Sequence, residues 1–344
     1  MNRKINIAVV GATGAVGREI FQILEERDFQ FENLDAIASK KSEGRKINFR
    51  DKEIVVKNIE NIDFKNYDIA LFSAGSSVSS KYGPIAGDSG CLVIDNTSFF
   101  RMQEDVPLII PEINSNILEN YFMNNNKKRN IISNPNCSTI QMLIALKPLH
   151  DLAIINRIVV STYQSVSGKG KNAMDELFEQ TKDIYANKTI NKKNFTKQIA
   201  FNVIPHIDDF LENGNTKEEQ KMIDETKKIM DPNINVVATC VRVPVFIGHA
   251  ESVNIEFDKN ISEEDAKNVL KDFDGISVVD YRKDEGYVTP VESAGDDKVY
   301  ISRIRKDLTV DNGISLWIVS DNLRKGAALN AVQIAETILK NKYL

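Results

Sequence analysis

The chain has 344 residues, of which 42% are apolar and 27% are charged. This length and balance fit a folded protein of about two domains, and they exclude a disordered chain. The 44 lysines and arginines are outnumbered by 49 aspartates and glutamates, so the net charge of -5 excludes a general attraction to nucleic acid.

Cysteine use and hydropathy indicate where the protein works. Three cysteines, Cys91, Cys137 and Cys240, cannot all pair, and such sparse use is typical of a reducing compartment. The first apolar run, residues 7–10, is too short for a signal peptide, and no stretch approaches the roughly 20 apolar residues of a membrane helix. We therefore expect a cytoplasmic globular protein.

The first third of the chain contains a series of short, almost continuous apolar runs. They are residues 5–11, 34–39, 53–59, 68–74, 91–96 and 130–134. Continuous rather than alternating hydrophobicity predicts strands that are buried on both faces, as in a parallel sheet covered by helices. Helices are expected over 15–26 and 77–90. The pattern predicts an α/β domain of the doubly wound, Rossmann type.

Beyond Asn134 the pattern changes. A helix is expected over 138–149, followed by a strand over 157–168 that runs into a glycine turn. A stretch rich in lysine and asparagine, 182–197, is typical of a surface excursion. Further strands are expected at 235–245, 251–257, 298–305 and 313–320. Strands in succession, with few helices between them, predict a mixed sheet in a second, α+β domain.

The last predicted helix, 326–339, carries a stripe of mostly small apolar residues. The stripe consists of Ala327, Ala331, Ile334, Ala335 and Ile338. One apolar face at helical spacing must be buried against another element. We expect this helix to pack back onto the first domain.

Three glycines, Gly11, Gly14 and Gly17, lie in the sequence GATGAVG between the first strand and the first helix. Glycine here permits a tight turn, close approach of the backbone to a pyrophosphate and close packing of helix on strand, while the helix N-terminus attracts phosphate. We interpret the segment as a dinucleotide-binding turn. An ordinary glycine turn is the competing interpretation.

The end of the second strand bears on the choice of cofactor. It runs into Ser39, Lys40, Lys41 and Ser42, with no carboxylate before Glu43. An acidic residue at this point binds the ribose hydroxyl of NAD, whereas the 2′-phosphate of NADP requires positive charge. The sequence favours NADP(H), although a solvated pair of lysines on a loop would give the same pattern.

Cys137 lies in SNPNCST, at the start of a predicted helix and among polar neighbours. A helix N-terminus stabilises a thiolate and lowers the pKa of the thiol. In a nucleotide-binding enzyme such a thiolate favours a thioester route, in which sulfur attacks an acyl carbon and hydride moves to or from that carbon. Cys91 and Cys240 lie inside apolar runs and fit structural roles. No CxxC or HExxH spacing indicates a metal site.

Arg242 is placed within a predicted apolar strand, where a guanidinium is costly without an anionic partner. A substrate carboxylate could be that partner through a bidentate bond, and an internal salt bridge is the alternative. Glu218 and Lys221 are three residues apart on a predicted helix with a Thr216–Glu219 capping box, so they share a face.

Eight sequence blocks occur in order along the chain: GATGAVG, NTSFFRM, NPNCST, STYQSVSGKG, FNVIPHID, EEQKMIDETKKI, RVPVFIGHAE and DNLRKGAALNAVQIAE. Together they resemble the aspartate-β-semialdehyde dehydrogenase family over nearly the whole length. The resemblance implies NADPH-dependent reductive dephosphorylation of β-aspartyl phosphate to aspartate β-semialdehyde. That reaction leads to diaminopimelate, lysine, methionine, threonine and isoleucine.

The same resemblance implies a homodimer and a division of the chain. The NADP-binding domain is expected to comprise residues 1–134 with 325–344, and the catalytic and dimerisation domain residues 135–324. One departure from the family pattern concerns Lys41, where the family more often has arginine.

Residue roles follow from the resemblance alone. It gives Cys137 the role of nucleophile and His249 that of acid/base, while His150 and His206 are interpreted as structural. Because His249 follows Gly248 at a break between strands, its side chain is expected to reach a cleft. The implied substrate contacts are Gln164, Arg242, Glu218, Lys221, Arg101 and Asn136. The implied cofactor contacts are Gly11, Thr13, Gly14, Ala15, Val16, Gly17, Lys41, Ser42, Ser167, Gly168 and Asn322.

Two other functions stay open on the sequence. N-acetyl-glutamyl-phosphate reductase shares the fold and the thioester chemistry. A non-catalytic sensor would bind NADPH but would need neither Cys137 nor His249.

Overall fold

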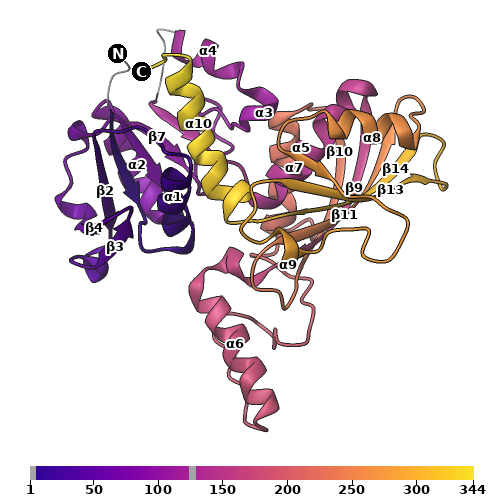
Figure 1. The fold of residues 1–344 in the computed structure, drawn as a ribbon, viewed down its shortest axis with the longest axis horizontal. Helices are drawn as coiled ribbons and strands as arrows, with labels where there is room; N and C mark the ends of the chain where they lie inside the picture. Colours follow the sequence, from indigo (N-terminus) through magenta and orange to yellow (C-terminus); the bar gives the residue numbers. More distant parts are fainter. Residues whose placement is uncertain (1–4, 124–128) are drawn as a thin grey trace. The chain divides into compact units, whose positions relative to one another are not determined.

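The computed structural model of the chain describes residues 5–123 and 129–344, which fold as two compact units (Figure 1). Unit 1 contains the described residues up to Asn136 together with Ala327–Leu344. Unit 2 is Cys137–Gly326.

Unit 1 is built on a six-stranded sheet in which all neighbouring strands are parallel. Its order is β5 (Lys57–Asn58), β2 (Asn33–Ala38), β1 (Asn6–Val10), β6 (Ile69–Phe72), β7 (Leu92–Asp95) and β8 (Ile131–Ser133). The chain winds outward from β1 in both directions, which creates the switch point where such sheets bind nucleotides. The doubly wound fold expected from the sequence is confirmed.

Helices cover both faces of this sheet because successive strand residues point to opposite sides. Ile7 and Val9 pack toward α1 (Ala15–Glu26) and α10 (Leu329–Lys340). Ala8 and Val10 pack on the other side with α2 (Ser76–Asp88). The predicted packing of the last helix on the first domain is confirmed, although α10 begins after a π-turn over Arg324–Ala328 rather than at residue 326.

The run at 53–59 differs from expectation, since it is two strands instead of one. β4 (Lys52–Val55) forms a hairpin with β3 (Lys46–Phe49), whereas β5 joins the main sheet beside β2. Short 3-10 turns occur at Lys40–Ser42, Ile59–Asn61 and Phe64–Asn66, and two short helices, α3 (Pro111–Asn114) and α4 (Ile117–Met123), follow β7.

Unit 2 is built on a mixed sheet, as predicted. Its order is β10 (Asn235–Arg242), β9 (Ile155–Gln164), β11 (His249–Phe257), β14 (Gly313–Ser320), β13 (Val299–Asp307) and β12 (Ile276–Val278). The two outermost pairs, β10–β9 and β12–β13, are parallel and the other pairs are antiparallel.

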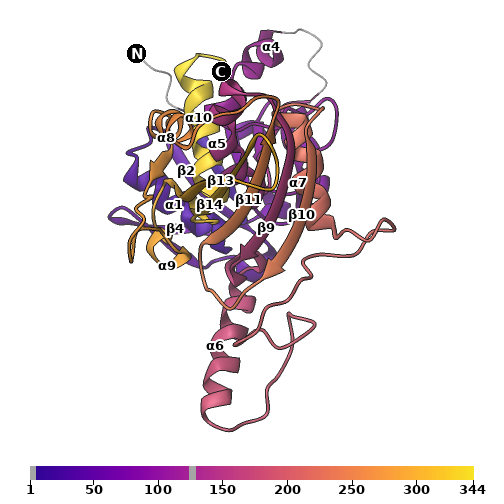
Figure 2. The same cartoon turned by 90° about the vertical axis from the view of Figure 1, so that its right-hand side faces the viewer.

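Helices cover one face of the mixed sheet. They are α5 (Cys137–Leu152), α7 (Lys217–Ile229) and α8 (Glu263–Lys271), which contact the strands directly or through each other. Figure 2 looks onto the opposite face, where no helix of the unit lies in front of β9, β10 and β11. The sequence did not predict α8, because its charged residues hide a short apolar stripe of Ala266 and Leu270.

The lysine- and asparagine-rich excursion begins inside a helix, α6 (Lys171–Tyr185), which projects away from the mixed sheet (Figure 1). Glu176 of α6 is buried and accepts hydrogen bonds from the backbone of Lys193 and Asn194, which ties the following loop to the helix. Two further short elements are the 3-10 turn Val166–Lys169 and α9 (Pro290–Ser293). Within the described ranges, no helix combines the length and the apolar character that crossing a bilayer requires.

Candidate active site

Three of the predicted site residues form one row across the end of the mixed sheet. Arg242 of β10 is paired with Gln164 of β9, and His249 is next in register on β11. All three are buried, and their neighbour Tyr163, which points to the other face, is exposed. Side chains at one level of a sheet share a face, so this row points toward the helices. We call His249, Gln164 and Arg242 the site row.

Cys137 is the first residue of α5, as predicted, and it is partly exposed. A Cβ atom on Gly326 would lie 2.8 Å from Cys137 Cβ and 3.3 Å from its Cα, so only glycine permits this close approach. Burial raises the pKa of Cys91 to about 12 and raises the pKa of Cys240 further. Of the three cysteines, Cys137 is therefore the one in a setting that favours reaction.

Ser165 holds the imidazole of His249. The backbone N–H of Ser165 donates to His249 Nδ1 at 3.1 Å, and Ser165 Oγ lies 3.0 Å from the same nitrogen. Because Nδ1 accepts the N–H, the neutral ring carries its proton on Nε2. Burial, followed by the charge of Arg242, lowers the pKa of His249 to about 3, so the ring is neutral at pH 7.

The side chain of His249 is fully buried, and its expected reach into a substrate cleft stays a prediction. Its Nε2 atom faces the turn that follows β9, where a Cβ on Gly168 would lie 3.5 Å away. The same Cβ would lie 3.2 Å from Arg242 Nη1. Gly168 thus leaves open the space beside both side chains.

Arg242 was expected in the middle of a strand, but it is the last residue of β10. The strand stops before Pro244. Its Nη1 donates to the carbonyl oxygen of Ser165 at 2.6 Å. Burial lowers the pKa of the guanidinium, and the nearby Glu218 and Cys137 oppose that shift. Ser165 therefore holds both ends of the site row, His249 through its N–H and Arg242 through its carbonyl.

Glu218 and Lys221 share a face of α7, as predicted, and their charged groups lie 3.0 Å apart. The Thr216–Glu219 capping box that fixes the start of α7 is present. Glu218 is buried and accepts from Gln164 Nε2 at 3.3 Å, which joins α7 to the site row.

Lys221 also contacts Asp208, at 2.8 Å. Burial would lower the pKa of the Lys221 ammonium, but Glu218 and Asp208 outweigh it and raise the pKa. Burial would likewise raise the pKa of the Asp208 carboxyl, but Lys221 outweighs it and lowers the pKa. The amine at this place stays protonated.

Asn322 and Ser167, which were expected to bind cofactor, hydrogen-bond to each other. Asn322 Oδ1 accepts from Ser165 Oγ at 3.0 Å, from Ser167 Oγ at 3.1 Å and from the backbone N–H of Gly248 at 2.9 Å. Both side chains are almost fully buried. They support the loops that carry His249, and their contact with a cofactor stays a prediction.

The glycine turn of unit 1 has the expected local structure. Gly11 has φ of +91°, and a Cβ there would lie 2.7 Å from the backbone of Ser73. Gly14 caps α1 without a side-chain hydrogen bond, so the first N–H groups of the helix are not capped by a side chain. Thr13 Oγ1 donates to Ser42 Oγ at 3.3 Å, which brings the end of β2 beside the turn.

The remaining predicted cofactor residues of unit 1 follow the same turn. Ala15 and Val16 are the first residues of α1, and Gly17 packs so tightly on Gly11 that no side chain fits. Lys41 is exposed on the 3-10 turn after β2.

Arg101 and Asn136 both belong to unit 1 and are buried. Arg101 donates from Nη2 to the carbonyl oxygen of Asn96 at 2.8 Å. The loop from Asn96 to Arg101 is held by Asp95, which accepts hydrogen bonds from the hydroxyl groups of Ser79 and Thr97. The guanidinium is thus fixed against the loop that follows β7.

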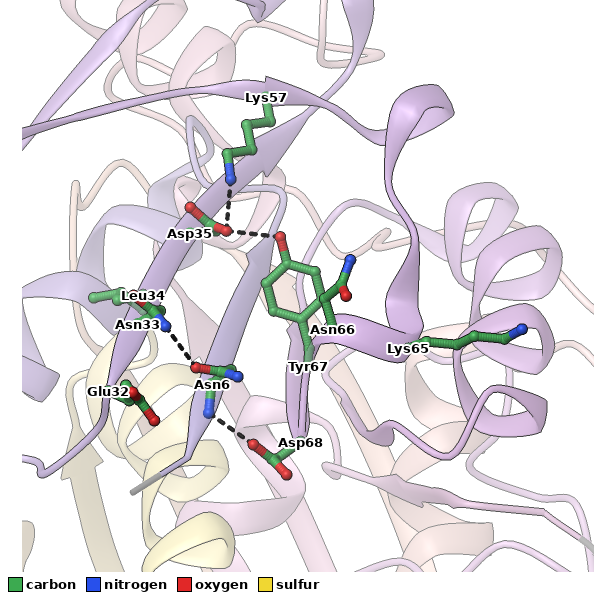
Figure 3. Close-up of a pocket in the computed structure, with 10 residues that line it drawn as sticks. All are labelled: Asn6, Glu32, Asn33, Leu34, Asp35, Lys57, Lys65, Asn66, Tyr67 and Asp68. Carbon is green, nitrogen blue, oxygen red and sulfur yellow. Dashed lines mark hydrogen bonds and ion pairs between the residues drawn. The ribbon is translucent and has the colours of Figure 1, made fainter. Parts of the chain in front are cut away.

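A separate polar cavity of about 810 Å³ lies at the amino-terminal edge of the parallel sheet (Figure 3). Asn6 and Asn33 line it, and Asp35 accepts from Lys57 and Tyr67 at 2.7 Å each. The glycine turn follows the opposite, carboxyl end of β1. The cavity is therefore distinct from the predicted nucleotide site.

Comparison with known proteins decides the family. The family description "Semialdehyde dehydrogenase, NAD binding domain" matches residues 6–121, and "Semialdehyde dehydrogenase, dimerisation domain" matches residues 146–325. The chain is 50% identical over 345 residues to the aspartate-semialdehyde dehydrogenase of Shewanella sp. (strain DB6705), with 100% of both chains covered. It is 52% identical over 338 residues to that of Aquifex aeolicus (strain VF5), with 97% of this chain and 98% of the relative covered.

The chain belongs to the aspartate-semialdehyde dehydrogenase family. Among solved structures, "aspartate semialdehyde dehydrogenase II complexed with ASA" from Vibrio cholerae matches with a TM-score of 0.95 and 48% identity, covering 98% of this chain and 99% of that one. Membership of the aspartate-semialdehyde dehydrogenases makes the protein an oxidoreductase of amino-acid biosynthesis with a domain for a nicotinamide dinucleotide. The family resemblance and the fold class expected from the sequence are confirmed.

The structure adds residues that the sequence did not single out for an aspartate-semialdehyde dehydrogenase. Ser165 acts mainly through its backbone, and Gly326 acts by lacking a side chain. Asp208 pairs with Lys221 from thirteen residues away. Each of these residues lies within one of the sequence blocks that carry the resemblance. The residue spacing in those blocks does not indicate which atoms the residue contacts.

Proposed function

We propose that Cys137 forms a thioester with the β-aspartyl group of β-aspartyl phosphate, and that NADPH reduces this thioester to aspartate β-semialdehyde. The observation that supports the proposal most directly is the buried, neutral His249 beside Arg242. Both lie on the sheet face that α5, which starts with Cys137, covers.

The first step is addition of the Cys137 thiolate to the β-carbonyl carbon. The tetrahedral adduct collapses as the carbon–oxygen bond to phosphate breaks, which releases inorganic phosphate and leaves an S-acyl bond. The start of α5 favours the thiolate that this step requires.

The bound cofactor supplies the hydride that reduces the acyl carbon. Negative charge then develops on the former carbonyl oxygen, and the Nε2–H of His249 donates a hydrogen bond to it. The carbon–sulfur bond breaks as the aldehyde forms, so Cys137 returns to a thiolate and the shared proton returns to Nε2. His249 is suited to this exchange because its low pKa keeps the ring neutral.

The substrate carries a carboxylate, an ammonium and a phosphate. We assign the carboxylate to Arg242, whose planar fork can bind it with two parallel hydrogen bonds. The ammonium is assigned to the buried carboxylate of Glu218, and Gln164, which already contacts Glu218, orients the substrate. The phosphate is assigned to the protonated Lys221 and to Arg101, with Asn136 as a further contact.

NADP is the proposed cofactor. The uncapped start of α1 and the cramped glycines of the turn fit a pyrophosphate, because a Cβ at Gly11 or Gly17 would collide with backbone. Lys40 and Lys41 follow β2 directly and fit a 2′-phosphate. The acid nearest to them within β2, Asp35, is paired with Lys57.

We propose a homodimer that forms through the open face of the mixed sheet. The rings of Tyr163 and Trp317 lie 5.7 Å apart on this face. Val237 of β10, which points to the same face as Tyr163, is 54% exposed. Aromatic and aliphatic side chains are enriched in the centre of subunit interfaces. Sedimentation should give twice the mass of the chain, and a monomer at micromolar concentration would contradict the proposal.

We assign residues 1–134 with 325–344 to the NADP-binding domain and residues 135–324 to the catalytic and dimerisation domain. We also propose that the enzyme works in the cytoplasm, where a reducing environment keeps Cys137 as a thiol.

The reaction is tested in its reverse direction, as reduction of NADP by aspartate semialdehyde. We expect the rate to depend on added inorganic phosphate, since phosphate must release the acyl group from Cys137. In the forward direction, preference for N-acetyl-glutamyl phosphate over β-aspartyl phosphate would reject the substrate. Cofactor binding without turnover of either compound would favour a non-catalytic sensor.

A further inference from the structure

Directly behind the site row lies a second buried row that contains an acid. Glu251 is two residues beyond His249 on β11, and it pairs with Thr162 of β9, which in turn pairs with Cys240 of β10. Glu251 is fully buried, and neither of its oxygens has a hydrogen-bond partner among the described residues. An ionised carboxylate in such a place would be very costly.

Gln141 approaches Glu251 from the helix side. It lies four residues after Cys137 on α5, so the two side chains share a face of the helix. Its Nε2 donates to the carbonyl oxygen of His249 at 3.4 Å, while its Oε1 is buried without a partner in the described part of the chain.

The two side chains lie close together, and Gln141 Oε1 and both Glu251 oxygens are buried acceptors without a donor among the described residues. The Gln141 amide lies close enough to oppose the raised pKa of Glu251, which burial drives well above its ordinary value, yet it makes no well-formed hydrogen bond to a carboxylate. A proton on Glu251 changes the carboxyl group into a donor. One hydrogen bond to Gln141 Oε1 then satisfies both groups.

We propose that Glu251 is a protonated positioning residue, which holds Gln141 and thereby fixes the start of α5, with Cys137, against the strand that carries His249. The link runs from the Glu251 carboxyl to the Gln141 amide and on to the carbonyl oxygen of His249. It rests on the proposed roles of Cys137 and His249, and it gives both residues a common support.

Among the described residues, no charged side chain competes for this proton. The side chains that face Glu251 are Gln141 from α5, Thr162 from β9 and Ile318 from β14, and none of them titrates near neutral pH. The titratable neighbours are His249 and Cys240, which burial holds in their neutral forms.

Two substitutions of Glu251 by side chains of similar length test whether a hydrogen-bond donor is needed at this position. Glu251→Gln keeps a neutral group that can donate to Gln141, so we expect kcat within about threefold of the wild type. Glu251→Met removes the donor, and we expect kcat to fall about 10- to 100-fold with little change in KM, because small errors in geometry are costly in catalysis.

A control comes from Glu176, a buried acid outside the site whose carboxylate accepts several hydrogen bonds. Glu176→Gln should lower the denaturant midpoint while kcat is retained, whereas Glu251→Gln should leave the midpoint at pH 7 unchanged or raised. If Glu251→Gln were as impaired as Glu251→Met, or failed to fold, the proposal that Glu251 is protonated would be refuted.

Infrared spectroscopy tests the protonation independently of catalysis. The wild type at pH 7 should have a protonated carboxyl band that is absent from Glu251→Gln and shifted in Gln141→Leu. Absence of such a difference would overturn the inference. Because the band does not depend on turnover, it would persist even if Cys137 proved not to be the nucleophile.

Discussion

The glycine turn of unit 1 and the site row of unit 2 both lie at the ends of strands, but they are built from different atoms. The turn presents backbone N–H groups and works because Gly11 and Gly17 have no side chains. The row presents side chains, His249 and Arg242, that are held from behind by the backbone of Ser165. A backbone site is damaged by adding atoms, whereas a side-chain site is damaged by removing or moving a functional group.

The largest effect is expected from loss of the nucleophile. Cys137→Ser should reduce turnover at least about 1,000-fold, because a hydroxyl is a far weaker nucleophile than a thiolate. Binding of NADPH, followed by fluorescence titration, should stay nearly intact since the glycine turn is untouched. Retained turnover would count decisively against covalent catalysis.

Gly326 of unit 2, like the glycines of the turn, works by lacking a side chain. Gly326→Ala should lower kcat about 100-fold, because the new Cβ would lie 2.8 Å from Cys137 Cβ and displace the sulfur. The matched control is Gly87→Ala in α2, whose Cβ would meet its neighbours at 3.5 Å or more and should leave kcat unchanged. Equal activity of both variants would mean that the position of Cys137 is not critical.

Arg242→Lys keeps the charge and removes the planar fork. We expect KM for the semialdehyde to rise about 10- to 100-fold with a smaller change in kcat, as a charged hydrogen bond is worth about 1.5–3 kcal/mol. Steady-state kinetics measure both constants. An unaltered KM would remove Arg242 from the substrate site.

His249 makes stability depend on pH. Its folded-state pKa of about 3 lies below the unfolded value of about 6.5. As the pH falls below about 6.5, the unfolded chain therefore binds a proton at His249 that the folded chain does not bind. Between pH 7 and pH 5 the wild type should lose about 2 kcal/mol more of its free energy of unfolding than His249→Asn. Urea unfolding at both pH values measures this difference, and parallel losses would show that the ring is protonated in the folded state.

The smallest effect is expected at the exposed lysine beside the glycine turn. Lys41→Ala should raise KM for NADPH about twofold to fivefold and leave KM for NADH unchanged, because a surface charge contributes about 1 kcal/mol or less. Lys52→Ala, on the exposed strand β4, serves as the control. Equal changes for the two cofactors would assign Lys41 a role other than binding the 2′-phosphate.

The contrast between the two regions also explains what the sequence could predict. The buried strands, the glycine turn and the start of α5 are local features, so continuous apolar runs and glycine spacing reveal them. The site row depends on the register of β9, β10 and β11, which brings Gln164, Arg242 and His249 together from distant parts of the chain. Only the family resemblance could nominate those residues together.

Other features left no signal in the sequence. Ser165 contacts Arg242 and in part His249 through backbone atoms, and Glu251 resembles any other glutamate until its burial is known. The end of β10 at Arg242 and the separation of β4 from β5 were missed because hydrophobicity continues past both breaks.

The covalent step can be observed most directly by mass spectrometry of the intact enzyme. Mixed with β-aspartyl phosphate without reduced cofactor and quenched in acid, the protein should gain the mass of one aspartyl group, located on the peptide that contains Cys137. An unmodified protein that nevertheless turns over with NADPH, or a label on Cys91 or Cys240, would contradict the thioester.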